Sequence, residues 1–145
     1  MSMRFSMVQT TAPRVVVVSE NPETVDGLQS YFVGVGIDAQ SSVSLDATVS
    51  LPERITALVC FPDGWGADEV IRRVRALHRR RPALLLLLVT RDPRRYTMAL
   101  TDERNEPSIV VLPKPAFGWA IVDAIRLHAE TLGTRDPRRP PGASR

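Results

Sequence analysis

The chain has 145 residues, of which 43% are hydrophobic and 24% are charged, and its formal net charge is +3. This length fits one domain with a proper core, and the composition is ordinary for a soluble globular protein. A lone Cys60 excludes an internal disulfide, and residues 1–13 lack the pattern of a signal peptide, so a cytoplasmic protein is expected.

The chain begins with a segment that shows no periodicity, residues 1–13, which should form a flexible extension. Arg14–Ser19 contains four consecutive valines and is typical of a strand buried on both faces. Asn21 then supplies a good helix cap and Pro22 suits the first helical position. An apolar stripe at helical spacing follows and should end near Gly34.

The next part of the chain is more mixed. Ile37–Ser42 is predicted to be a short edge strand and Leu45–Leu51 a short helix. Thr56–Phe61 is a third predicted strand, closed by the turn residues Pro62–Gly64. In Ala67–Leu77 apolar residues recur at helical spacing opposite a face of arginines, which predicts an amphipathic helix.

The longest apolar run is Ala83–Thr90, with five successive leucines. It is too short to cross a bilayer and is bounded by arginine and proline, so it is predicted to be a buried strand of a parallel sheet. Asp92-Pro93 opens a shorter helix that passes through Leu100. Ser108–Leu112 is the last predicted strand and Gly118–Thr131 the last predicted helix.

This order predicts an α/β fold in which strands and helices alternate five times, (βα)5. Such chains form a doubly wound, flavodoxin-like sandwich of three layers (αβα) around a five-stranded parallel sheet. The domain is expected over residues 14–132, followed by a basic, proline- and arginine-rich tail, residues 133–145, that should be disordered. Reactive groups in such sheets lie at the carboxyl ends of the strands, so the function should lie there.

With these strand ends together, the chain resembles the receiver domain of bacterial response regulators. The resemblance rests on Val-Val-Val-Val-Ser-Glu-Asn-Pro at the first strand, on the threonine that ends the fourth, and on the Lys-Pro pair that ends the fifth. It covers roughly Arg14 to Leu132. It implies a pocket in which an acidic pair holds Mg²⁺, an aspartate accepts a phosphoryl group, and a threonine and a lysine sense the new charge. It also implies a cis bond between Lys114 and Pro115.

The chain departs from that pattern at two positions. Ser19 takes the place of the first acid, with Glu20 at the second. Pro62 stands where the phosphoacceptor should be, and Asp63 follows one residue late, which along a strand would turn it to the opposite face unless the loop compensates. The pocket residues carried over are Ser19, Glu20, Pro62, Asp63, Thr90 and Lys114.

These departures predict a vestigial pocket. Mg²⁺ needs near-octahedral oxygen ligation, and phosphoryl transfer depends on positioning and charge stabilisation, so losing one acid and displacing the acceptor should abolish the chemistry. No cofactor is expected. Glu20 is predicted to form an ion pair with Lys114 in place of the metal.

The function expected from this combination is that of a pseudo-receiver. It would be a phosphorylation-independent protein–protein interaction module in bacterial signalling, and not an enzyme. The first alternative is an active single-domain receiver that accepts a phosphoryl group on Asp63, with Mg²⁺ on Glu20 and Asp63. A flavodoxin-like protein that binds a nucleotide or a small ligand is a second alternative, although no glycine-rich phosphate loop follows any strand.

The last helix predicts the partner surface. Val122, Ile125 and Ala129 are expected to face the sheet. The opposite side then forms a small apolar strip with a polar rim, typical of an association surface for a signalling partner or for a second copy of the chain. The residues of this strip are Ala120, Ala124, Leu127 and Thr131.

Two arginine-rich segments, Arg79–Arg81 and the tail, would suit nucleic acid. A solvated helix end and a disordered tail explain them equally well, and no helix-turn-helix fits after Leu132. Direct binding to nucleic acid is therefore not expected, nor is a membrane partner.

Overall fold

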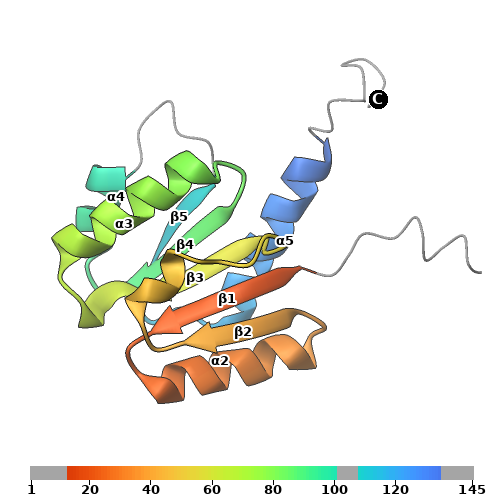
Figure 1. The fold of residues 1–145 in the computed structure, drawn as a ribbon. Helices are drawn as coiled ribbons and strands as arrows, with labels where there is room; N and C mark the ends of the chain where they lie inside the picture. The colour runs from red at the N-terminus through yellow and green to blue at the C-terminus, as the bar shows by residue number, and fades with distance from the viewer. Residues whose placement is uncertain (1–12, 101–107, 135–145) are drawn as a thin grey trace, which may run out of the picture.

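The computed structural model describes residues 13–100 and 108–134. Its centre is a five-stranded parallel sheet with the strand order β2-β1-β3-β4-β5 (Figure 1). The strands are β1 (Arg14–Ser19), β2 (Asp38–Ser42), β3 (Ala57–Phe61), β4 (Leu85–Thr90) and β5 (Ile109–Pro113). The helices are α2 (Pro22–Gly34), α3 (Ala67–Arg80), α4 (Pro93–Leu100) and α5 (Gly118–Thr134), with two 3-10 turns, η1 (Leu45–Thr48) and η2 (Pro62–Gly64).

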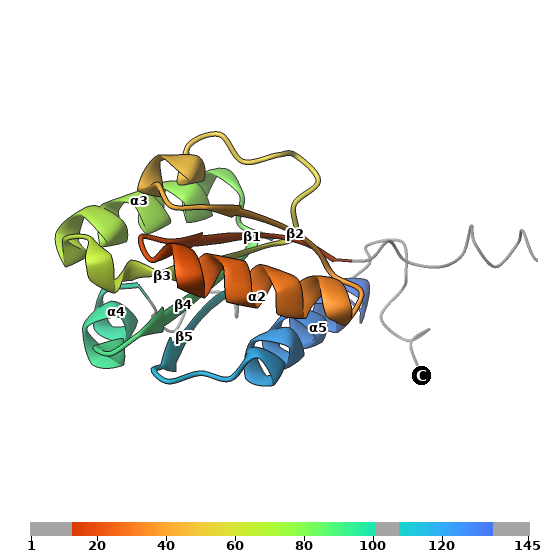
Figure 2. The ribbon, with the colours of Figure 1, turned by 90° about the horizontal axis from the view of Figure 1, so that it is seen from below.

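Helices cover both faces of this sheet, which confirms the three-layer α/β fold predicted from the sequence. Alternate strand residues point into two separate cores: Val15 and Val17 pack with α2 and α5, whereas Val16 and Val18 pack with α3 and α4. Figure 2, seen from below, looks onto α2 and α5, with the sheet behind them. All six residues of β4 are buried, as expected for an interior strand covered on both sides.

Most predicted elements are present with small shifts of their ends. Asn21 caps α2 through its side chain, which accepts the backbone N–H of Glu23 at 2.9 Å. The expected helix Leu45–Leu51 is only the four-residue turn η1, because its short polar residues bond to the local backbone: the Thr48 hydroxyl donates to the Leu45 carbonyl at 2.9 Å. α5 continues three residues beyond the predicted end at Thr131. The described helices include none that is long and apolar enough to cross a membrane.

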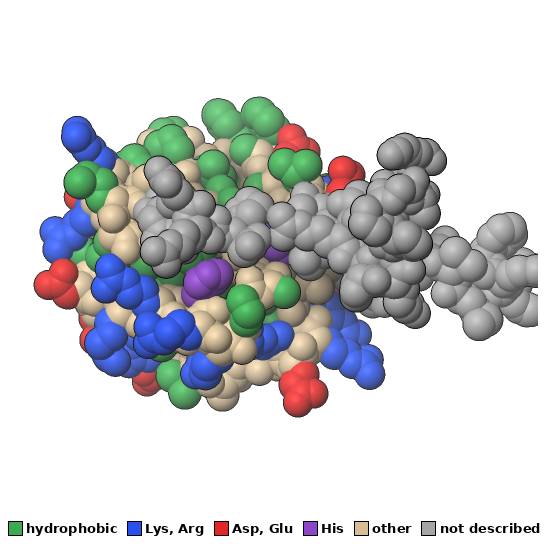
Figure 3. Space-filling model, turned by 90° about the horizontal axis from the view of Figure 1, so that it is seen from above, with side chains coloured by type: hydrophobic (Ala, Val, Ile, Leu, Met, Phe, Trp, Pro, Cys, Tyr) green, Lys and Arg blue, Asp and Glu red, His purple; other side chains and the backbone are tan. Residues whose placement is uncertain are grey.

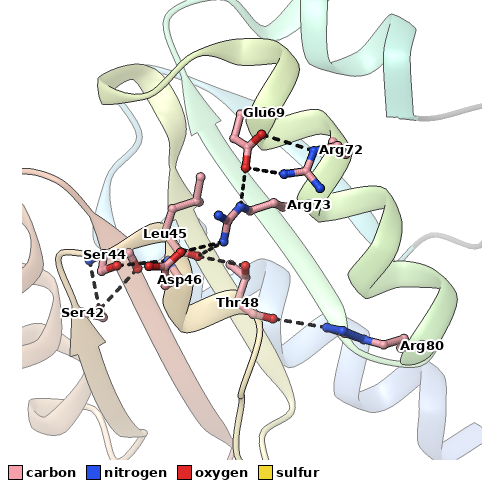
Figure 4. Close-up of polar contacts among 9 residues, drawn as sticks. All are labelled: Ser42, Ser44, Leu45, Asp46, Thr48, Glu69, Arg72, Arg73 and Arg80. Atoms are coloured by element: carbon pink, nitrogen blue, oxygen red, sulfur yellow. Dashed lines mark hydrogen bonds and ion pairs between the residues drawn. The ribbon is translucent and has the colours of Figure 1, made fainter.

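An ion-pair network fastens η1 to α3 (Figure 4). The guanidinium of Arg73 lies 2.7 Å from Glu69 on its own helix and 3.0 Å from Asp46 on η1. Arg72 also binds the Glu69 carboxylate. The arginines of this part of α3 therefore hold the segment between β2 and β3 in place.

The contacts of Glu69 predict a low pKa for its carboxyl group. Hydrogen bonds from Arg72 and Arg73 lower the pKa of this carboxyl from 4.5 to about 2. Because the folded-state pKa is depressed, the stabilisation is present above about pH 4.5 and is lost as the pH falls toward 2. A carboxyl-detected NMR titration should give this low value for Glu69 and an ordinary one for it in an Arg72→Ala/Arg73→Ala variant. An unchanged titration in that variant would contradict the assignment.

Candidate functional site

A pocket of about 460 Å³ opens at the carboxyl ends of the strands. The parallel register brings these ends together: Ser19 lies opposite Phe61 and Thr90 opposite Pro113. Of the six residues predicted from the sequence, four line the pocket: Ser19, Glu20, Asp63 and Lys114. The other two, Thr90 and Pro62, are buried beside it.

Asp63 is the centre of the pocket. The η2 turn, closed by a hydrogen bond of 3.0 Å from the Trp65 N–H to the Pro62 carbonyl, directs the Asp63 side chain toward β4 and β5. The Thr90 hydroxyl donates to Asp63 Oδ1 at 2.5 Å, the Arg91 backbone N–H donates to Oδ2 at 2.9 Å, and Lys114 Nζ lies 3.1 Å from Oδ2. The loop therefore compensates for the one-residue displacement of Asp63, and both of its oxygens are engaged.

Lys114 is held through both its backbone and its side chain. Its backbone N–H donates to the Thr90 carbonyl at 2.9 Å, and the Lys114–Pro115 peptide bond is cis, as the resemblance implied. Its ammonium group lies 5.9 Å from the centre of the Phe61 ring, a cation–π contact. Its side chain is 31% exposed, so the charge is only partly desolvated.

The predicted ion pair between Glu20 and Lys114 is wrong. Lys114 pairs with Asp63, and no salt bridge within residues 13–100 and 108–134 involves Glu20. The Glu20 side chain instead lies over Gly64, where an added Cβ would stand 2.2 Å from Glu20 Cδ. The physical reason is the η2 turn, which supplies Lys114 with a less exposed carboxylate than that of Glu20.

The surroundings of Asp63 keep it ionised. Partial burial raises its pKa, but the hydrogen bonds from Thr90 and from the Arg91 backbone, together with Lys114, outweigh burial and leave the pKa below its ordinary value. Burial and the nearby Asp63 charge raise the pKa of Cys60 to about 12. The thiol therefore stays protonated, and the Asp63 carboxylate lies between two cations, the Lys114 ammonium at 3.1 Å and the Arg91 guanidinium at 3.6 Å.

The residues of this pocket do not fit a magnesium ion. Glu20 and Asp63 are the acids that border it, and the Asp63 oxygens are already bound to Thr90, Arg91 and Lys114. Ser19 brings no charge to the pocket, and its hydroxyl accepts the Asn21 backbone N–H at 3.1 Å. In the described part of the chain, no group of three or more His, Cys, Asp or Glu side chains is placed to hold a metal.

The strip predicted on the last helix is less regular than its sequence suggested. Leu127 is 64% exposed, but Ala120 and Ala124 are half-buried, and Ala124 packs against the core shared with α2. Ile121, Val122 and Ile125 are buried as expected, but Ala129, which was expected to face the sheet with them, is exposed, although it has the same helical phase. The side chain of Thr131 lies outside the described residues.

Sequence reasoning did not single out an aromatic pair at the start of α5. The rings of Phe117 and Trp119 stack almost parallel, with centroids 6.1 Å apart, and both side chains are exposed. Between them, Gly118 leaves room for Tyr31 of α2, whose ring would lie 2.8 Å from an added Cβ. The signal in the sequence was an aromatic residue on each side of a glycine.

Comparison with known proteins gives matches only among solved structures. No protein-family model and no curated protein matches the chain. A response regulator receiver domain protein from Clostridium thermocellum is 12% identical with a TM-score of 0.67, and the match covers 84% of this chain and 98% of that one. A CheY-like receiver domain protein from Methanospirillum hungatei is 12% identical with a TM-score of 0.66, over 86% and 99% of the two chains.

A third match is the signal receiver domain of an HD domain-containing protein from Pseudomonas fluorescens. It is 17% identical with a TM-score of 0.64, and the match covers 86% of this chain and 99% of that one. Identities this low establish a likeness of fold. The chain has the fold of a response regulator receiver domain.

Proposed function

We propose that the chain is a pseudo-receiver, a module that acts in bacterial signalling through protein–protein contacts without being phosphorylated. The observation that supports this proposal best is the engagement of both Asp63 oxygens by Thr90, Arg91 and Lys114. In a working receiver, by the resemblance, the threonine and the lysine respond to a new phosphoryl charge. Here both already bind a carboxylate, so the pocket has one satisfied arrangement.

The small number of acidic residues in the pocket that could hold a cation also supports this proposal. Phosphoryl transfer relies on cations that neutralise the charge of the transferred group. Ser19 cannot supply the charge of the missing acid, and Glu20 lies over Gly64. The chain is thus proposed to bind partners rather than to catalyse a reaction.

The direct test is exposure to acetyl phosphate and Mg²⁺ followed by intact mass spectrometry. The mass is expected to stay unchanged, while an active receiver domain treated in parallel gains one phosphoryl group. A phosphoryl adduct on the wild type that disappears in Asp63→Ala would contradict the proposal.

One observation favours the alternative, an active receiver. Asp63 faces the pocket next to Thr90 and Lys114, the neighbours that a phosphoacceptor would need. In that case an Asp63 oxygen would attack the phosphorus of acetyl phosphate and acetate would leave. The adduct described above is the result that would establish it.

The apolar strip on α5 stays a prediction for the partner surface. Leu127→Arg is expected to leave the fold intact and to weaken association with a signalling partner or with a second copy at this strip. Val43→Arg is the matched control, because Val43 is also exposed but lies between β2 and η1. If both variants keep every association of the wild type, the strip is not an interface.

A further inference from the structure

The two helical layers carry opposite charge. α3 has five arginines and two acids, and α4 has two arginines and no acid. On the other face of the sheet, α2 has two acids and no basic residue, and α5 has two acids and one arginine. The sheet separates these two layers (Figures 1 and 2). By the residues of the helices, the layer of α3 and α4 is basic and the layer of α2 and α5 is acidic.

The basic layer presents its arginines outward. In Figure 3, Lys and Arg side chains gather at the lower left of the view, over α3. Arg75, Arg79, Arg80 and Arg94 are exposed and form no salt bridge between described residues, although Arg75 donates to the Ala99 carbonyl at 2.8 Å and Arg80 to the Thr48 carbonyl at 3.4 Å. Within the described residues, the guanidinium groups of Arg79 on α3 and Arg94 on α4 have neither kind of contact. α3 and α4 form one continuous surface, because Arg95 pairs with Asp68 at 3.1 Å. Guanidinium groups are therefore available over both helices.

The acidic layer offers groups that bind guanidinium. Asp123 and Glu130 are exposed on α5, on the same side of the helix as Trp119. The stacked rings of Phe117 and Trp119 give a flat, exposed aromatic surface beside them. Carboxylates accept bidentate hydrogen bonds from arginine, and aromatic faces stack with it. The one arginine of α5, Arg126, is directed to the Val35 carbonyl at 3.3 Å.

We propose that the acidic layer, α2 with α5, docks the arginine layer, α3 with α4, of a second copy of this chain. The contact joins two different surfaces, so it is head-to-tail. The two layers lie on opposite faces of one sheet. A docked pair therefore still has a free acidic layer at one end and a free arginine layer at the other. Further copies can add at both ends, so the assembly grows as an open chain. The proposed signalling role requires a partner of unstated identity. This inference goes beyond that role, because it makes a second copy of the chain a partner.

Charge complementarity favours a second copy over nucleic acid. Phosphates would match the arginine layer alone and would leave the acidic layer and its exposed aromatic pair without a role. A second copy uses both surfaces at once. Binding of nucleic acid would depend on the arginine layer alone, whereas docking of a second copy depends on both layers. Substitutions in the acidic layer therefore distinguish the two.

Matched charge reversals test this docking. Sedimentation velocity of the full chain should show mass increasing with concentration at about 0.05 M salt and returning to the monomer at about 0.5 M, where charges are screened. Arg79→Glu/Arg94→Glu and Asp123→Arg/Glu130→Arg should each remain monomeric. An equimolar mixture of the two variants should associate again, because each variant retains the layer that the other has lost. Arg79→Lys/Arg94→Lys, the charge-preserving control, should still associate.

The outcomes separate the explanations. A wild type that stays monomeric at low salt, or a mixture of variants that does not associate, would overturn the proposal. So would binding of an oligonucleotide by the arginine layer without any self-association. A symmetric dimer through the Leu127 strip would survive Arg79→Glu/Arg94→Glu, and that result would also contradict head-to-tail docking.

Discussion

Replacing Asp63 by alanine is expected to lower the free energy of unfolding by about 1.5–3 kcal/mol, the usual range for hydrogen bonds to a charged group. The change removes the acceptor of the Thr90 hydroxyl and of the Arg91 N–H, and it leaves the partly buried Lys114 without its counter-charge. Urea denaturation at neutral pH measures the effect. Asp26→Ala, on the exposed face of α2, is the control and should have little effect.

Two further measurements attribute that loss to the Asp63–Lys114 pair. Lys114→Met should destabilise by a similar amount, and the double variant by less than the sum, because the two side chains share one contact. The pKa of Asp63 is lowered in the folded state, so its stabilisation is present above the ordinary carboxyl pKa and disappears as the pH falls through the lower folded value. The stability of wild type and of Asp63→Asn should therefore converge in acid. Additive single changes, or a pH-independent gap, would contradict the pairing.

Leu87→Ala is expected to have the largest effect on stability, about 2–5 kcal/mol. Leu87 is fully buried in the interior strand β4, where its removal leaves a cavity between the sheet and the layer of α2 and α5. Leu127→Ala deletes the same atoms from an exposed position and should change stability by less than about 0.5 kcal/mol. Thermal or urea unfolding compares the two. Equal effects would contradict the position of β4 in the core.

The fold was predictable because its signals are local and agree with one another. Runs such as Arg14–Ser19 and the leucines of β4 are short, apolar on both faces and bounded by turn or cap residues, which is typical of strands in a covered parallel sheet. The amphipathic pattern of α3 and the cap at Asn21 place helices between the strands. The weak segment Leu45–Leu51 was predicted less well, because a few residues without a strong pattern can form a helix or a single turn.

The interior of the pocket was not predictable to the same degree. Which carboxylate meets Lys114 depends on the direction of the chain after β3. Along a strand, a shift of one residue would turn Asp63 to the opposite face of the sheet, but the 3-10 turn η2 brings it back to the pocket. Periodicity carries no information on such a turn. The charge difference between the layers was also hidden, since it becomes visible only when the topology puts α2 with α5 and α3 with α4.

The measurement that tests the central claim most directly is an amide NMR spectrum of the domain with and without beryllofluoride and Mg²⁺. The pocket is proposed to be in one fixed arrangement, with Asp63 bound to Thr90, Arg91 and Lys114, so the signals of these residues and of their neighbours should not move. Saturable shifts centred on Asp63, Thr90 and Lys114, absent in Asp63→Ala, would show that the pocket takes up a phosphoryl analogue and would contradict the claim.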